Sequence, residues 1–148
     1  MFWWRQRKLL KKIDRKQIEQ AIADAERQTS GEICVSVAPL FWGNLQRAAE
    51  KAFVRLGLTA TKERNGVLLF IVPSRRRFAV IGDTGIHEKV GQEFWDRVTA
   101  AMAEKFRAGQ FTEGLLHGIN EAAEQLRTHF PYNRATDTNE LPNKIDFG

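Results

Sequence analysis

The stretch that decides the fold spans residues 64–86 and reads RNGVLLFIVPSRRRFAVIGDTGI. Its first apolar run, residues 67–72, predicts a strand that is buried on both faces. A second run, residues 78–81, predicts another strand, and the break between the runs is short enough for a hairpin. These two strands are therefore expected to be antiparallel neighbours in one sheet.

The rest of the chain alternates between helical and strand periodicity. Residues 16–28 place apolar side chains on one helical face, whereas residues 33–37 alternate large and small side chains as a strand does. Further helices are predicted over residues 44–57, 87–107 and 112–129. The first strand, the helix after it and the second strand form a right-handed βαβ unit, so these strands are parallel. The sequence thus predicts an α/β fold, a three-layer α/β/α sandwich around a mixed central sheet.

Length and composition favour a single domain. The 148 residues divide into a basic, Trp-rich lead-in (1–15), a globular domain (16–131) and an extended C-terminal tail (132–148). No apolar run approaches the length of a membrane span, and no signal peptide is recognisable. The single cysteine, Cys34, is expected to be a core residue in a reducing cytoplasm.

Positive charge is concentrated at the start of the chain. Residues 1–16 hold seven basic side chains and one acidic one, a net +6, while the other 132 residues hold sixteen and seventeen, a net −1. Such a segment suits the inner, anionic surface of a membrane or a membrane protein. Packing of the lead-in on the body or on another subunit is the alternative, and no nucleic acid is expected. The residues predicted to make these contacts are Trp3, Trp4, Arg5, Arg7 and Lys8.

The predicted topology brings three short motifs to one edge of the sheet. Because the third strand runs against the other two, its end lies beside their beginnings. Glu32 and Asp83 offer carboxylate oxygens there, and Asn65 offers an amide oxygen; these donors suit calcium or magnesium and not zinc. Arg64 and Thr84, at the start of the next helix, are candidates for binding an anion such as phosphate.

Plainer interpretations of the same residues remain open. Glu32 would then face solvent or pair with Arg64, and Asn65 would belong to a turn. Asp83 or Thr84 would only cap the helix that follows. At the hairpin tip, on the opposite edge of the sheet, residues 75–77 are three arginines that form either a solvated turn or a partner site.

The ordered set of motifs resembles the TPM domain family, also called the TPM phosphatase family, and especially its small bacterial members without a membrane span. The resemblance covers about residues 16–147 and implies an α/β/α sandwich, divalent metal binding and an acid phosphatase activity proposed for one branch. Only Glu32, Asn65 and Asp83 match motifs that carry over as site positions. The motifs are TSGEICV (29–35), RNGVLLFIV (64–72), FAVIGDTGI (78–86), FW (94–95), FRAGQFTEGL (106–115) and NELPN (139–143).

Residues and resemblance together predict an interaction or accessory domain that binds a divalent metal ion and works at a membrane surface. The alternative is a metal-dependent, acid phosphatase-like hydrolase of phosphate esters, with the metal polarising the phosphoryl oxygen. The sequence shows no H-x-x-x-H cluster, no D-x-D and no Cys-x5-Arg loop, so no catalytic residue is assigned. The expected location is cytoplasmic, peripheral at the inner face of the membrane.

Overall fold

The computed structural model describes residues 13–38, 43–132 and 145–147. The order of the elements is α2 (Arg15–Glu26), β1 (Glu32–Val37), α3 (Leu45–Arg55), η1 (Leu58–Ala60), β2 (Gly66–Val72), η2 (Pro73–Arg75), β3 (Arg77–Gly82), α4 (Thr84–Arg107) and α5 (Phe111–His129).

The three strands form one mixed sheet in the order β1–β2–β3. β1 and β2 are parallel, with Glu32 opposite Gly66, and β2 and β3 are antiparallel, with Val67 opposite Gly82. All seven residues of β2 are buried, as expected of a central strand whose sequence is a continuous apolar run. The predicted βαβ unit and hairpin are both confirmed.

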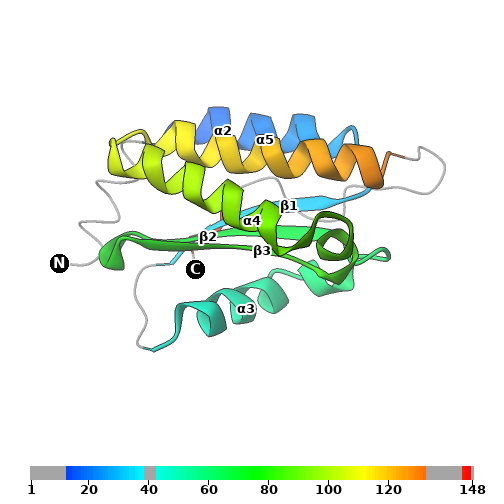
Figure 1. Cartoon of the computed structure of the whole chain (residues 1–148), viewed down its shortest axis with the longest axis horizontal. Coiled ribbons are helices and arrows are strands. Elements are labelled where there is room, and N and C mark those ends of the chain that lie inside the picture. The colour runs from blue at the N-terminus through cyan, green and yellow to red at the C-terminus, as the bar shows by residue number, and fades with distance from the viewer. Residues whose placement is uncertain (1–12, 39–42, 133–144, 148) are drawn as a thin grey trace.

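Helices cover both faces of the sheet, which confirms the predicted α/β/α sandwich. α2, α4 and α5 lie on one face and α3 on the other (Figure 1). Side chains along β1 point alternately to the two faces of the sheet. Ile33, Val35 and Val37 point to the face covered by α2, α4 and α5 and join the core there. Cys34 faces α3 and packs near Ala49, where small side chains let the helix lie close to the sheet.

The helix predicted from residue 87 begins earlier and is interrupted. Asp83 is its N-cap, so the helix starts at Thr84. Gly91 has φ 77° and ψ 167°, a conformation that suits glycine, and it breaks α4 into a short first piece and a long second one. The apolar periodicity of the long piece continues across the break, which hid the kink at the level of sequence.

Residues near the C-terminus extend the sheet beside β1. The Val37 N–H donates to the Asp146 carbonyl at 2.7 Å, and the Asp146 N–H donates to the Val35 carbonyl at 2.9 Å. The Asp146 carboxylate accepts from the Ser36 hydroxyl and from both terminal nitrogens of Arg55. The outer edge of β1 is thereby paired and held to α3.

The contacts predicted for the basic lead-in involve residues that lie outside the described ranges. Nothing about Trp3, Trp4, Arg5, Arg7 or Lys8 follows from the structure. Across the described part of the chain, no helix combines the length and the apolar character needed to cross a membrane.

Candidate functional site

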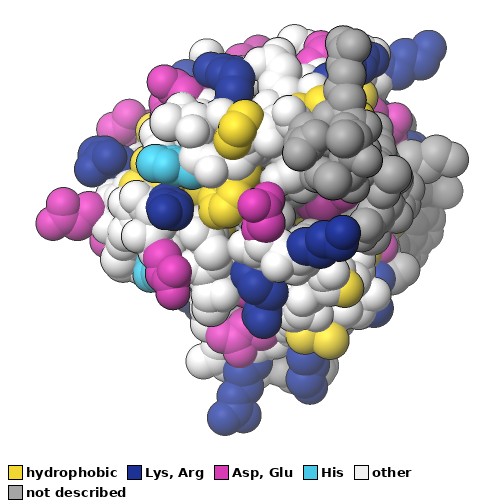
Figure 2. Space-filling model, turned by 90° about the vertical axis from the view of Figure 1, so that its right-hand side faces the viewer, with side chains coloured by type: hydrophobic (Ala, Val, Ile, Leu, Met, Phe, Trp, Pro, Cys, Tyr) yellow, Lys and Arg dark blue, Asp and Glu magenta, His cyan; other side chains and the backbone are white. Residues whose placement is uncertain are grey.

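The candidate site lies at the end of the sheet where β3 stops and β1 and β2 begin. The register places Glu32 opposite Gly66, and the Asp83 N–H donates to the Gly66 carbonyl at 2.9 Å, so the three motifs share this end. Figure 2 shows it as a surface where acidic and basic side chains alternate around a small apolar patch beside a histidine.

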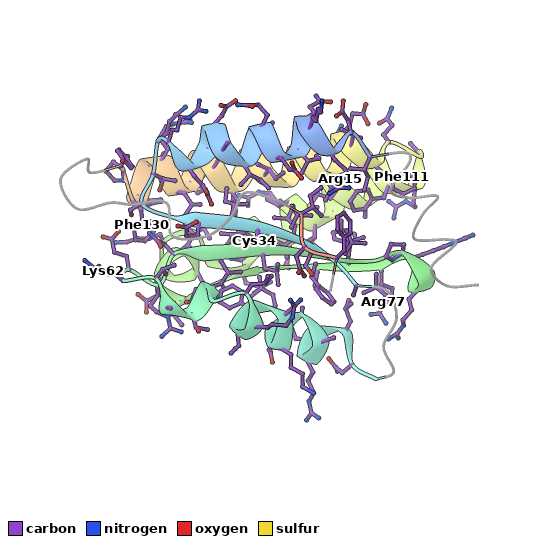
Figure 3. All side chains as sticks on the ribbon, turned by 180° about the vertical axis from the view of Figure 1, so that it is seen from behind. Arg15, Cys34, Lys62, Arg77, Phe111 and Phe130 are labelled. Atoms are coloured by element: carbon purple, nitrogen blue, oxygen red, sulfur yellow. The ribbon has the colours of Figure 1, made fainter. Side chains whose placement is uncertain are left out.

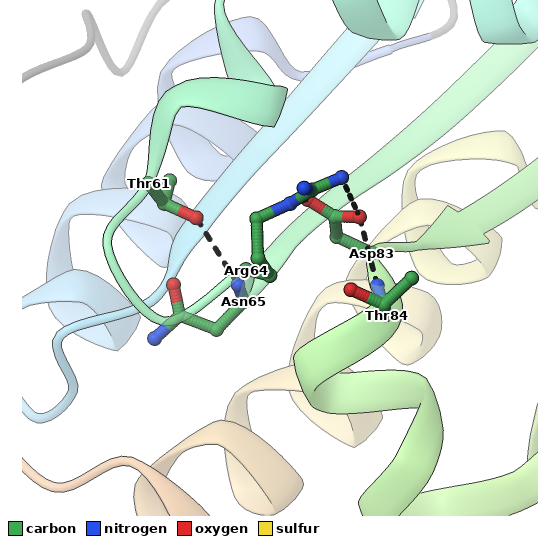
Figure 4. A network of polar contacts seen from close by, with 5 residues as sticks. All are labelled: Thr61, Arg64, Asn65, Asp83 and Thr84. Carbon is green, nitrogen blue, oxygen red and sulfur yellow. Dashed lines mark hydrogen bonds and ion pairs between the residues drawn. The ribbon is translucent and has the colours of Figure 1, made fainter.

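Arg64 and Asp83 form a two-pronged ion pair at this end (Figure 4). Arg64 Nε donates to Asp83 Oδ2 at 2.7 Å, and Arg64 Nη2 donates to Asp83 Oδ1 at 3.0 Å. The carboxylate is buried, whereas the guanidinium is half-exposed. Hydrogen bonding to Asp83, followed by the negative charge of Asp83, raises the pKa of Arg64. The predicted anion-binding cation is therefore already bound to an acidic side chain of its own chain.

The start of α4 has its N–H groups occupied. Asp83 Oδ1 accepts from the Thr84 N–H at 2.8 Å, and the Arg64 carbonyl accepts from the Gly85 N–H at 2.8 Å and from the Ile86 N–H at 3.3 Å. Gly85 is required here, because a Cβ atom on it would lie 2.0 Å from the Glu63 carbonyl oxygen. Capping by Asp83, one of the plainer interpretations, is what these contacts show; anion binding by Arg64 and Thr84 stays a prediction.

Asn65 is almost completely enclosed, with 1% of its surface exposed. Its N–H donates to Thr61 Oγ1, and its Nδ2 donates to Ser30 Oγ, each at 3.1 Å (Figure 4 shows the Thr61 bond). The Ser30 hydroxyl donates in turn to Glu63, which fixes the orientation of the Asn65 amide. Asn65 Oδ1 has no hydrogen-bond partner among the described residues.

Glu32 lies against a second buried carboxyl group, that of Glu26. The two residues are 5% and 8% exposed, and Glu26 Oε2 accepts from the Ile33 N–H at 2.8 Å. Burial, and then the hydrogen bond to Glu32, raise the pKa of Glu26 to about 9. Glu26 therefore keeps its proton at neutral pH, in its hydrogen bond with Glu32.

Sequence reasoning missed Glu26, although a signal for it exists. Ile18, Ile22 and Glu26 are spaced four residues apart and lie on the buried face of α2. An acidic residue on the same buried helix face as two isoleucines must either pair with another polar group or take up a proton. The helix predicted over residues 16–28 contains this position, but the apolar periodicity that predicts the helix does not mark an acidic residue.

Cys34 is a core residue, as predicted. Burial, followed by the nearby acidic side chains of Glu26, Glu32 and Asp146, raises the pKa of its thiol to about 12. Since the thiolate is the nucleophile and the metal ligand, Cys34 is poorly suited to either role.

A hollow of about 370 Å³ adjoins the ion pair, between α3, β3 and α4. It is lined by Phe53, Val54 and Ile81 on its apolar side and by Thr84 and His87 among its polar groups. His87 accepts at Nδ1 from the buried Trp95 Nε1 at 3.2 Å, so its remaining ring nitrogen, Nε2, carries the proton in the neutral form. Trp95 packs on the sheet against Gly82.

The predicted metal ligands share one end of the sheet but do not form a ready cage. Asp83 is engaged by Arg64, Asn65 by Ser30, and Glu32 by Glu26. Within residues 13–38, 43–132 and 145–147, no group of three or more His, Cys, Asp and Glu side chains is placed to hold a metal ion. Metal binding by these residues stays a prediction.

Comparison with known proteins agrees with this fold. The chain is similar to the BA42 protein of the psychrophilic bacterium Bizionia argentinensis, solved by NMR, with 37% identity, a TM-score of 0.82, and coverage of 90% of this chain and 92% of that one. The N-terminal domain of a protein from P. gingivalis shares the fold at 20% identity, with a TM-score of 0.60 over 78% of this chain and 76% of that one. No curated protein matched. The model of the TPM domain matches residues 5–125, and the chain belongs to the TPM domain family.

Proposed function

We propose that this TPM domain is an accessory interaction domain that binds a divalent cation, calcium or magnesium, at the sheet end formed by Glu32, Asn65 and Asp83. The lead-in with Trp3 and Trp4 brings it to an anionic membrane surface. In this role the cation holds the end of the sheet together and sets its charge.

The observation that carries the metal proposal is the buried amide oxygen of Asn65. A buried oxygen without a partner costs about 1–3 kcal/mol, so a ligand that binds it recovers that energy. Asn65 Oδ1 is the oxygen in question, and the Asn65 carbonyl contacts the Glu32 N–H at 3.4 Å, next to the carboxyl pair. A cation is the kind of ligand that an amide oxygen beside two buried carboxyl groups favours.

The donor set fits a hard cation that keeps part of its water shell. Magnesium is commonly bound by one or two carboxylates with several waters, so a complete protein cage is unnecessary. Glu32 supplies charge and Asn65 a neutral oxygen. Asp83 is the third ligand, and Arg64, which already binds it, makes it the weakest of the three.

The test is a titration of the 15N-labelled full chain with calcium chloride, magnesium chloride and zinc sulfate. We expect amide shifts at Glu32 and Asn65 with the first two salts, and affinity about tenfold lower in Glu32→Gln. Glu124→Gln, an exposed change on α5, is the matched control. Unchanged spectra at millimolar salt, or equal affinity in both variants, would overturn the metal site.

The membrane part has its own test, co-sedimentation of the full chain with vesicles of phosphatidylcholine, with and without phosphatidylserine. The triple change Arg5→Gln, Arg7→Gln and Lys8→Gln should abolish binding to the anionic vesicles, because it removes charge next to the tryptophans. Removing the same charge at the hairpin tip, residues 75–77, should leave it intact. Equal loss in both variants, or no binding by the unaltered chain, refutes the membrane role.

The accessory role is preferred to the phosphatase alternative because Arg64 and the first N–H group of α4 already have hydrogen-bond partners within the chain. A phosphoryl group needs donors aimed at its oxygens. At this end, the Arg64 guanidinium and the Thr84 N–H are both committed to Asp83. The first piece of α4, residues 84–90, is also too short to offer a strong helix dipole.

A further inference from the structure

One edge of the sheet lacks a neighbouring strand in the described part of the chain. β1 is bordered by Asp146 on its outer side, whereas β3 is the last strand of the order β1–β2–β3 (Figure 1). An edge of this kind presents backbone donors and acceptors in a row, which is a template for another extended chain.

The register tells which backbone groups of β3 point outward. The Asp83 N–H donates to the Gly66 carbonyl, so Asp83 points toward β2, and groups along an antiparallel strand alternate in direction. Phe78, Val80 and Gly82 therefore direct their N–H and C=O groups away from β2. None of the described residues forms a backbone hydrogen bond with these three outward positions.

A side-chain pocket lies beside this edge on the α3 face. Ala79 and Ile81 face α3, so a residue that pairs opposite Ile81 directs its side chain to the same face. There it meets the hollow lined by Phe53 and Val54, and Val54 is the most exposed large apolar residue of the described chain, at 62%. The edge thus combines a backbone template with a place for one apolar side chain.

Charge distinguishes the two ends of the edge. Arg76 and Arg77 are exposed where β3 begins, and Figure 3 places Arg77 at the opposite end of the sheet from Lys62. Within the described ranges, no acidic side chain forms an ion pair with either arginine. An acidic residue on a bound chain is the complement of this end.

We propose that β3 binds an extended peptide segment of a partner protein as an added strand, with an apolar side chain opposite Ile81 and acidic residues beside Arg76 and Arg77. Backbone hydrogen bonds to Phe78, Val80 and Gly82 supply the affinity, and the pocket and the arginines supply the selectivity. The inference deepens the accessory role proposed above by giving its partner a chemistry, and it rests on that role but not on metal binding.

The probe is a synthetic peptide of about seven residues, the usual length of a strand, with alternating threonine and valine and two acidic residues at one end. It is titrated into the 15N-labelled full chain. We expect shifts and slowed hydrogen exchange at the Phe78, Val80 and Gly82 amides. A peptide with the same sequence but N-methylated at the residues facing β3 should bind at least about tenfold more weakly.

Reversing the charge of Arg76 and Arg77 tests which peptide the edge selects, and this test does not depend on a loss of binding alone. The double variant Arg76→Glu, Arg77→Glu should bind the acidic peptide at least about tenfold more weakly and should prefer a version in which lysines replace the acidic residues. Because one peptide loses and another gains, this pattern cannot arise from misfolding.

Three results would overturn the proposal. The first is equal binding by the N-methylated peptide. The second is exchange protection at Phe78 and Val80 before peptide is added, which would mean that the chain's own lead-in covers the edge. The third is the same protection appearing with protein concentration and self-association, which would make a second copy the occupant. The metal titration reads out at Glu32 and Asn65, so either idea can fail alone.

Discussion

Glu26 and Glu32 bring two carboxyl groups together inside the protein, one from the last turn of α2 and one from the first position of β1. Glu26 holds its proton in this pair, because burial and the hydrogen bond with Glu32 raise the pKa of Glu26 to about 9. Glu26 also accepts from the Ile33 N–H, so the same side chain occupies one backbone donor at the outer edge of β1, where Asp146 pairs with Val35 and Val37.

The first prediction concerns stability against pH. The folded pKa of Glu26 lies above its ordinary value of 4.5, so the folded protein binds a proton that the unfolded chain releases. The contribution of Glu26 to the free energy of unfolding is complete below pH 4.5. It is lost as the pH rises toward about 9, by up to about 1.4 kcal/mol per pH unit. Urea unfolding in EDTA between pH 5 and 8 measures this slope.

Glu26→Gln keeps the acceptor for the Ile33 N–H and a donor for Glu32 but does not titrate. Its stability should therefore fall less steeply with pH, and it should exceed the parent above neutral pH. Glu19→Gln, on the same helix, is the control and should follow the parent. Parallel curves for the parent and Glu26→Gln would contradict the proton held by Glu26.

The second prediction separates the two roles of Asp83. Asp83→Ala removes both the helix cap and the partner of Arg64, and should lower the free energy of unfolding by about 2 kcal/mol. Asp83→Asn still caps α4 and loses only the charge; because Arg64 is half-exposed and its ion pair is screened by water, that loss should be clearly smaller than the loss in Asp83→Ala. Urea denaturation gives both values. Equal losses would show that the ion pair outweighs the cap.

The third prediction concerns the backbone at Arg64, whose φ is 52°. Both Arg64→Gly and Arg64→Ala lose the guanidinium, but only alanine keeps a Cβ in the left-handed region. The glycine variant should be more stable by about 1 kcal/mol. At Lys62, which lacks a positive φ, the same pair of changes should favour alanine or show no difference. The reverse order at Arg64, read from urea midpoints, would count against the strained turn.

The fourth prediction concerns the reactivity of Cys34, the single cysteine. With its pKa raised from 9.0 to about 12, the thiolate fraction at pH 8 falls about a thousandfold. The folded protein should react with a chromogenic disulfide reagent only as fast as it unfolds, while the urea-unfolded chain reacts at once. Comparable rates in the two states would mean that Cys34 is accessible.

Much of the architecture was predictable because it depends on local patterns. The apolar run in β2, the alternation in β1 and the 3.6-residue period of α5 identify their elements within a few residues. The handedness of βαβ units and the short hairpin then leave few ways to arrange three strands. The sequence misplaced the start of α4 and passed over its kink at Gly91, since both depend on backbone geometry.

Pairing of the polar side chains was less predictable. The motifs around Glu32, Asn65 and Asp83 were correctly expected at one end of the sheet. Which side chain binds which depends on rotamers and burial, and sequence periodicity carries neither. Arg64 pairs with Asp83, not with Glu32, because the turn at Arg64 directs its guanidinium across the end of β3.

By itself, the sequence determined the order and type of the elements, the mixed sheet and the shared end of three motifs, because these follow from periodicity and chain connectivity. Only the tertiary structure decided that Glu26 meets Glu32, that Asp83 is held by Arg64 and that Asp146 closes the edge of β1. The physical reason is that a buried polar group takes whatever partner packing brings within reach, however distant in sequence.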